Sequence, residues 1–394
     1  MQPYSYQTEI SREGAAILRE HGAVYLAMEE RTGKTLTAML IAERISAIRV
    51  LVITKAKALV GWSQTVSAYK SKVSFDLSSY HQAYKLASNH YDLVIIDEAH
   101  AVISGYPKPG KILKEIYPIV VGKPVIFMSA TPHAQSYSQL YHQFVLWHKS
   151  PWAQHKNFYS WHKEYGVPYS LEINGIKIPQ YDKTREDKVL PGILSLFITK
   201  TRAELGFEQE PEDVLHYVEL GEDTKSVYNE LIKNELVELK AGMLVCDSAS
   251  KMRFSLHQLE GGTVIIENEY IVLANREKID YVLKHWGDSK DLVIMYHYKA
   301  ELTKLSAVFK NATLLQATSY AEGVDLSMYK HLVIYSQDFS TAKHTQRRAR
   351  QANKNRGTEI KVHFLLTKGG LSERVYKTVS KNKKNFVDTV FTRI

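Results

Sequence analysis

Short apolar runs that alternate with helical segments constrain the fold of this chain most. A strand that is apolar along its whole length must be buried on both faces, so the alternation predicts α/β domains with parallel sheets covered by helices. Ligands of such sheets bind at the carboxyl ends of the strands. The runs are Val24–Ala27, Val50–Ile53, Leu93–Ile96, Val125–Met128, Val214–Leu220, Leu292–Tyr296, Thr313–Leu315, Leu332–Tyr335 and Val362–Leu366.

An aromatic-rich stretch interrupts this alternation between the two halves of the chain. Its aromatic residues recur at helical spacings, which is typical of the buried face of a helix. We therefore expect one α/β domain over 1–136, a mainly helical insertion over 137–205, and a second α/β domain over 206–394. The last domain is expected to contain a helical stretch at about 222–262 and a closing helix. A chain of 394 residues is long enough for two or three domains with their own cores.

A phosphate-binding loop is predicted between the first apolar run and the helix that follows it. Thr32, Gly33, Lys34 and Thr35 stand where a strand-to-helix turn would aim backbone N–H groups at an anion. In such a loop the lysine reaches the β- and γ-phosphates and the hydroxyl of Thr35 binds Mg²⁺. Met28 occupies a position at which the general pattern has glycine.

The most specific feature is the apolar run that ends in Asp97 and Glu98. One carboxylate at the end of a buried strand can hold Mg²⁺, and the next can orient or deprotonate the attacking water. The alternative is an acidic loop without chemistry. Because a Gly-Lys-Thr sequence follows an earlier strand, we interpret Asp97 as the Mg²⁺ partner and Glu98 as the general base.

Composition narrows the class of protein and the kind of partner. The net charge of +9 and pI near 9.1 indicate a polyanionic partner. Cys246 is the only cysteine, so an intrachain disulfide is excluded and a reducing cytosol fits, which would be the host cytoplasm for a viral protein. No apolar run reaches the length that spans a bilayer, and we expect no membrane association.

The Asp97–His100 segment, with Ser129–Pro132 further along, resembles motifs II and III of superfamily 2 helicases and translocases. The similarity extends over nearly the whole chain and is closest to compact Swi/Snf-like ATPases of the kind carried by tailed bacteriophages. It implies two RecA-like lobes, ATP and Mg²⁺ as cofactors, and a DNA partner. It also implies that His100, Ser129 and Thr131 couple the nucleotide to the nucleic-acid site.

Other segments resemble further motifs of this family. Gln7 matches the adenine-reading glutamine of the Q motif, and Gly323 and Asp325 fall in a motif V-like segment implied to contact the nucleotide. Nucleic-acid contacts are implied at the positions that match motifs Ia, Ib and IV. These positions are Thr54, Lys55, Trp62, Ser79, Tyr80 and His297.

Two arginines resemble the fingers of motif VI. Arg347 and Arg350 would share one face of a helix and meet the charge that develops on the transferred phosphoryl group. In an alternative register the fingers fall on Arg350 and Asn353. A basic helix that faces DNA is a further alternative.

Arg31 is the position at which the phosphate loop departs from the family, which usually has glycine there. Glycine is used where backbone approaches phosphate closely, often with a positive φ. We expect Arg31 to take an ordinary backbone conformation with its side chain turned outward.

These observations predict a nucleic-acid-dependent ATPase that moves on, or remodels, double-stranded or branched DNA. An RNA helicase is a remaining alternative, because the Asp-Glu-Ala-His sequence of Asp97–His100 also occurs in RNA enzymes. A nucleic-acid-binding module that does not hydrolyse ATP is the alternative from another class. The oligomeric state is not specified by the sequence, and a monomer is compatible with it.

Overall fold

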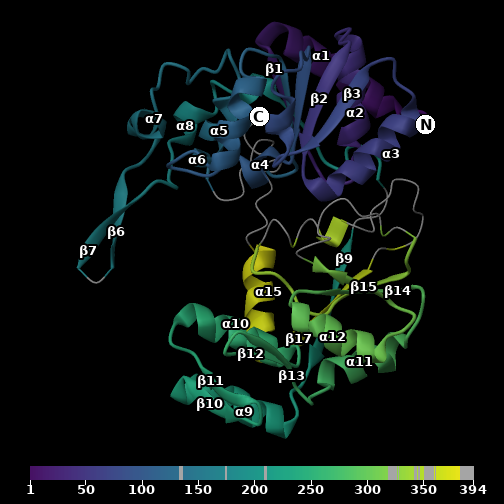
Figure 1. Cartoon of the computed structure of the whole chain (residues 1–394), viewed down its shortest axis with the longest axis vertical. Helices are drawn as coiled ribbons and strands as arrows, with labels where there is room; N and C mark the ends of the chain where they lie inside the picture. Colours follow the sequence, from purple (N-terminus) through teal and green to yellow (C-terminus); the bar gives the residue numbers. More distant parts are fainter. Residues whose placement is uncertain are drawn as a thin grey trace. The chain divides into compact units, whose positions relative to one another are not determined.

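The chain folds into two units, each built around its own parallel sheet (Figure 1). The computed structural model describes residues 1–132, 136–173, 175–207, 211–317, 326, 328–340, 344, 347–349, 359 and 361–381. The first unit contains the described residues of Met1–Gly206, and the second those of Phe207–Lys383. The prediction of two α/β lobes with parallel sheets is confirmed.

The first unit has a six-stranded sheet in the order β3-β2-β4-β5-β1-β8. All neighbouring strands in it run parallel, so their carboxyl ends meet at one edge. The apolar runs predicted as strands form the centre, and two further strands, β3 and β8, extend the edges. The strands are β1 (Ala23–Met28), β2 (Arg49–Thr54), β3 (Ser74–Ser79), β4 (Leu93–Asp97), β5 (Val125–Met128) and β8 (Phe197–Lys200).

Helices and short 3₁₀ turns connect these strands, as a parallel sheet requires. Helix α2 starts directly at the predicted phosphate loop, and α4 starts directly after the acidic pair. The connecting elements are α1 (Ser5–His21), α2 (Lys34–Arg44), η1 (Ala56–Ala58), α3 (Leu59–Tyr69), η2 (Ala83–Leu86), α4 (Ala99–Val102) and α5 (Lys111–Val120).

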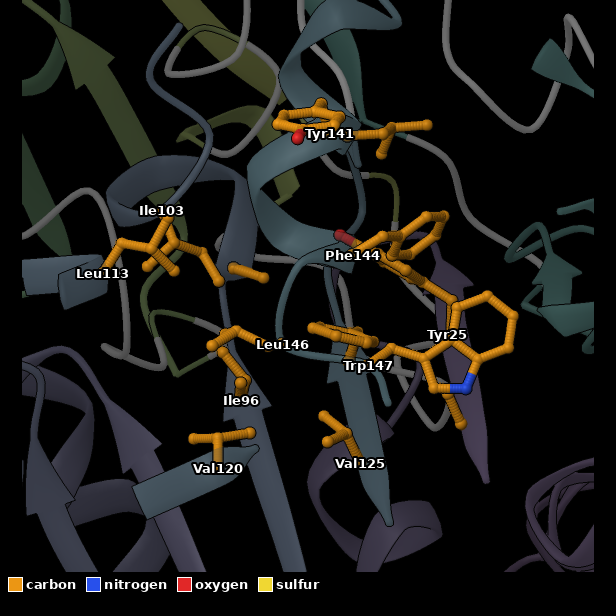
Figure 2. Close-up of a cluster of buried hydrophobic side chains, with 14 of the residues drawn as sticks. Tyr25, Ile96, Ile103, Leu113, Val120, Val125, Tyr141, Phe144, Leu146 and Trp147 are labelled. Atoms are coloured by element: carbon orange, nitrogen blue, oxygen red, sulfur yellow. The ribbon is translucent and has the colours of Figure 1, made fainter. Parts of the chain in front are cut away.

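The aromatic-rich segment packs onto the first sheet and shares its core. Phe144, Leu146 and Trp147 lie against Tyr25 and Val125 in one buried cluster (Figure 2). The segment is less helical than predicted, because it also holds a β-hairpin that extends away from the rest of the unit (Figure 1). Its elements are α6 (Ser138–Phe144), α7 (Phe158–Tyr165), β6 (Tyr169–Ile173), β7 (Ile176–Gln180), α8 (Glu186–Val189) and η3 (Leu194–Leu196).

The second unit has a five-stranded parallel sheet in the order β15-β14-β16-β17-β9. Helices α11 and α12 precede and follow strand β14 along the chain, and α15 follows β17. The elements are β9 (Glu212–Val218), α11 (Glu277–Trp286), β14 (Leu292–Tyr296), α12 (Lys299–Val308), β15 (Thr313–Gln316), β16 (His331–Ile334), β17 (Lys361–Thr367) and α15 (Leu371–Lys381).

The stretch 222–262, predicted to be helical, is two helices separated by a hairpin. Glu235 has a φ of 59°, which ends the first helix, and the next residues alternate between buried and exposed side chains as a strand does. The helices are α9 (Glu222–Asn234) and α10 (Ala249–Glu260). The hairpin is β10 (Leu236–Leu239) with β11 (Gly242–Val245), and a second hairpin follows, β12 (Thr263–Ile266) with β13 (Glu269–Val272).

Among the described residues, no helix is both long enough and apolar enough to cross a membrane.

Candidate nucleotide site

The predicted phosphate loop connects the carboxyl end of β1 to α2. Gly33 has a φ of 77° and precedes a helix that begins without a side-chain cap, so no capping side chain occupies the N–H groups of its first turn. The ammonium group of Lys34 folds back over the loop and donates to the carbonyls of Met28 and Glu29, both at 2.8 Å. Burial lowers the pKa of Lys34, while the nearby Glu98, Glu30 and Asp97 oppose that shift.

Arg31 does not take the ordinary backbone conformation that we expected. Its φ is 67°, in the left-handed region that favours glycine. The loop therefore keeps the backbone shape for which the family uses glycine, at a cost of about 1–2 kcal/mol for a residue with a Cβ.

Helix α1 holds the other side of the loop. The hydroxyl of Tyr6 donates to the carbonyl of Thr32 at 3.1 Å, and the amide nitrogen of Gln7 donates to the carbonyl of Gly33 at 3.1 Å. The amide oxygen of Gln7 accepts from the backbone N–H of Tyr4 at 2.9 Å. Both the nitrogen and the oxygen of the Gln7 amide thus form hydrogen bonds within the protein. To bind adenine, this side chain would have to replace these hydrogen bonds with bonds to the base.

Arg202 is a site residue that the sequence analysis missed. Its backbone N–H donates to the Glu29 carboxylate at 2.7 Å, and its guanidinium donates to the Glu30 carbonyl at 3.3 Å. The N–H of Glu29 also donates to the carbonyl of Lys200, at the end of β8. The segment that leaves the first sheet is therefore bonded to the phosphate loop, and only the fold brings these residues together.

The Asp97 carboxylate is held by uncharged donors. Its Oδ2 accepts from the hydroxyl of Thr54 at 2.8 Å and from the indole N–H of Trp62 at 2.9 Å. The hydroxyl of Tyr80 donates to the Asp97 carbonyl at 2.8 Å. Because the hydroxyl of Thr54 and the indole of Trp62 are neutral, they orient the carboxylate without compensating its negative charge.

This arrangement changes the interpretation of the motif Ia and Ib positions. Thr54, Trp62 and Tyr80 are at most 2% exposed, and Ser79 is also buried. Side chains so enclosed do not support direct contact with nucleic acid, and the first three act instead on Asp97. Lys55, directly after β2, is half-buried and follows Thr54 at the same edge.

Glu98 and the coupling residues follow the same strand end. Glu98 has a φ of 53° and is the residue before α4, so its side chain leaves the sheet in a direction that ordinary strand geometry does not give. Nδ1 of His100 lies 3.3 Å from the Glu98 carboxylate and 2.7 Å from the hydroxyl of Ser129. That hydroxyl accepts from the backbone N–H of Thr131 at 2.9 Å. A hydrogen-bonded chain thus joins the ends of β4 and β5.

Burial lowers the pKa of His100 to about 3, and the positive charges of Lys55 and Lys34 add to that shift. The imidazole is therefore neutral at physiological pH, and its contact with Glu98 is not an ion pair. An unfolded histidine takes up a proton near pH 6.5, so this site loses stability as the pH falls below that value toward the folded pKa.

In the second unit, the side chain of Arg347 is buried and not exposed at the surface. Its side chain is 2% exposed, and one guanidinium nitrogen lies 3.3 Å from the Asp338 carboxylate. Burial lowers the pKa of Arg347 to about 10, and the negative charge of Asp338 partly offsets this shift.

His297 lies close to the same carboxylate, with its Nδ1 at 3.7 Å. It also lines a hollow of about 580 Å³, together with the exposed Phe254 and Tyr270. Arg350, Asn353, Gly323 and Asp325 lie outside the described residues.

The residues of the first unit fit a nucleoside triphosphate with Mg²⁺. An added Cβ on Gly33 would collide with the side-chain amide of Gln7, and the φ of 77° also disfavours a side chain at this turn. An uncapped helix start beside the half-buried Lys34 suits an anion, and the oxygens of Asp97 and Thr35, the second residue of α2, are of the kind that Mg²⁺ prefers.

No protein-family model and no curated protein matches the chain. Among solved structures, it is similar to the SWI2/SNF2 ATPase core of Sulfolobus solfataricus, solved in complex with double-stranded DNA. The two are 15% identical, and the similarity covers 100% of this chain and 95% of that chain, with a TM-score of 0.45.

Proposed function

We infer that the chain is a nucleic-acid-dependent ATPase that moves on, or remodels, DNA. The observation that carries this inference is the meeting of Lys34, Asp97 and Glu98 at the carboxyl edge of one sheet, where both carboxylates act electrostatically on the lysine. An anion-binding lysine, a cation-binding carboxylate and a second carboxylate for the water are the parts that phosphoanhydride hydrolysis needs.

ATP, when bound, supplies the reactive phosphoanhydride, and Mg²⁺ supplies positive charge beside it. Lys34 and the first turn of α2 bind the phosphates, and Thr35 and Asp97 hold the metal. Glu98 accepts the proton of the attacking water. We assign Gly323 and Asp325 to nucleotide contact, and Arg347 and Arg350 to charge stabilisation, on the family resemblance.

DNA is the proposed partner on the strength of the motif order and the net charge of +9. Lys55 and His297 remain the proposed contacts from the original set, since they lie at the ends of β2 and β14 and are half-buried rather than enclosed. The compact bacteriophage kind of Swi/Snf-like ATPase is the finer assignment that we propose, on the same motifs.

The test is phosphate release from ATP with no nucleic acid and with duplex DNA, branched DNA, single-stranded DNA or RNA. We expect duplex or branched DNA to stimulate turnover most. Greatest stimulation by RNA would instead make the protein an RNA enzyme. ATP binding without release under any condition would make it a non-hydrolysing module, and turnover that no nucleic acid stimulates would overturn the motor assignment.

A further inference from the structure

The first unit carries a hollow of about 750 Å³ that the proposed ATPase reaction does not use. It lies between α5 and the chain from α6 to the start of α7, and its floor includes Phe144 and Trp147 of the core cluster (Figure 2). Ligand pockets in proteins commonly have volumes of about 300–1,000 Å³. The hollow is thus large enough to receive several side chains of a partner.

Exposed apolar side chains from separate elements gather around this hollow. Tyr117, Val121, Val145 and Tyr159 line it and are between 36% and 41% exposed. They come from α5 and the turn after it, from the residue after α6, and from α7. Isolated exposed apolar residues are ordinary on a protein surface, but a group around one concavity marks an interaction site.

The rim of the hollow is basic. The exposed Lys108, Lys114 and Lys156 line it together with His148 and His155, and no aspartate or glutamate is among its lining residues, all of which are described. The carboxylate of Glu164, which does not line the hollow, lies 3.5 Å from His155. The hollow therefore combines an apolar floor with a positive border.

The hollow is separate from the candidate nucleotide site. Val121 and Gly122 line it and precede β5, so this part of it lies toward the amino ends of the strands. Lys34, Asp97 and Glu98 follow the carboxyl ends of strands in the same sheet. An occupant of the hollow would thus leave the nucleotide residues open.

We propose that this hollow binds an acidic segment of a partner protein that inserts aliphatic or aromatic side chains between Tyr117, Val145 and Tyr159. Apolar anchors in a concave patch with complementary charges at the rim are the usual elements of protein recognition. Single-stranded nucleic acid would also meet lysines and aromatics, but it needs stacking faces along a groove that follows the backbone. Val121 and Val145 offer aliphatic surface instead, which favours a peptide.

The experiment measures fluorescence anisotropy of labelled synthetic peptides with the full chain. The probe carries glutamates interspersed with leucine–phenylalanine pairs. One control peptide replaces every glutamate by lysine, and another replaces the leucines and phenylalanines by alanine. We expect the first peptide to bind at least about tenfold more tightly than either control, because it alone supplies both complementary charge and anchors.

Variants locate the binding on the surface. The double variant K114E/K156E and the single variant Val145→Asp should each weaken the acidic peptide by about tenfold or more. Lys177→Glu reverses an exposed charge on β7, outside the hollow, and should change affinity less than about twofold. None of these residues belongs to the proposed ATPase machinery, and an unchanged midpoint of thermal unfolding verifies that each variant is folded.

Equal binding of all three peptides, or peptide binding that K114E/K156E leaves unchanged, would overturn the proposal. Tighter binding of an oligothymidylate than of the acidic peptide, lost in K114E/K156E, would overturn it in favour of nucleic acid. Neither outcome depends on ATP hydrolysis, so the proposal and the ATPase assignment fail independently.

Discussion

A buried carboxylate lies at or shortly after a strand end in each unit, and the two differ in whether a charged side chain contacts them. Asp97, at the end of β4, accepts from the hydroxyl of Thr54 and the indole of Trp62. Asp338, beyond β16, lies against the guanidinium of Arg347. Neutral donors orient a carboxylate without cancelling its charge, whereas a buried arginine compensates it. The first arrangement is suited to binding a cation, and the second to fixing structure.

The largest expected effect tests the chemical side of this contrast. Glu98→Gln keeps the size of the side chain and removes the proton acceptor, so ATP turnover should fall by about 10²–10⁴-fold with nucleotide binding retained. Phosphate release and the affinity for a fluorescent nucleotide are the measurements. Glu115→Gln, on α5, is the control and should leave both near wild type. Normal turnover in Glu98→Gln would contradict the assignment of the base.

Arg347→Ala tests the structural side. It leaves Asp338 buried without its guanidinium partner, and we expect the free energy of unfolding to fall by about 3–5 kcal/mol. Thermal or denaturant unfolding of the full chain measures this, with the exposed Arg253→Ala of α10 as control. If stability is unchanged while DNA-stimulated turnover is lost, Arg347 acts as a finger rather than as a partner that compensates Asp338.

Trp62→Phe sharpens the contrast at Asp97. It removes one neutral donor and keeps most of the ring, so the carboxylate becomes less well oriented. Removal of such an outer partner typically costs about 10–100-fold in metal affinity. The Mg²⁺ concentration that gives half-maximal turnover should rise by that order, while Trp286→Phe in the second unit should not change it. An unaltered Mg²⁺ requirement would remove Trp62 from the site.

The smallest expected effect concerns the phosphate loop. Arg31→Gly replaces a residue at φ 67°, and we expect the free energy of unfolding to rise by no more than about 1 kcal/mol. The relief of backbone strain only slightly exceeds the conformational entropy that glycine adds to the unfolded chain. Ser46→Gly, at φ 60°, is the matched control away from the loop. The midpoints of thermal unfolding and ATP affinity are compared. A loss of ATP affinity confined to Arg31→Gly would show that its side chain takes part in binding.

Much of the fold could be predicted because buried parallel strands are nearly pure apolar runs. Strand β3 was missed because Ser74–Ser79 is a mostly polar strand at the sheet edge, where no apolar run is required. The hairpin β10–β11 was missed because its short apolar segments also satisfy a helical pattern. Its start depends on Glu235, which ends α9 with a positive φ that glutamate does not usually adopt, so the residue type gives no signal there.

The site residues also differ in whether local sequence order or only tertiary contacts indicate them. Lys34, Asp97 and Glu98 could be proposed from local order, because each lies at or shortly after the carboxyl end of a strand. The partners of Asp97 were assigned to nucleic acid from their motif positions, since only the assembled sheet shows that Thr54 and Trp62 donate to its carboxylate and Tyr80 to its backbone carbonyl. Arg202 carried no local signal at all. Its contact with Glu29 joins residues from distant parts of the chain.

That contact has a mechanical meaning. Lys200 and Arg202 lie on the last described stretch before the first unit ends at Gly206, and both are bonded to Glu29 at the start of the phosphate loop. The loop and the exit of the chain are therefore connected in series. A displacement of the chain at that exit would therefore act directly on the bonds that hold Glu29 at the start of the phosphate-binding turn.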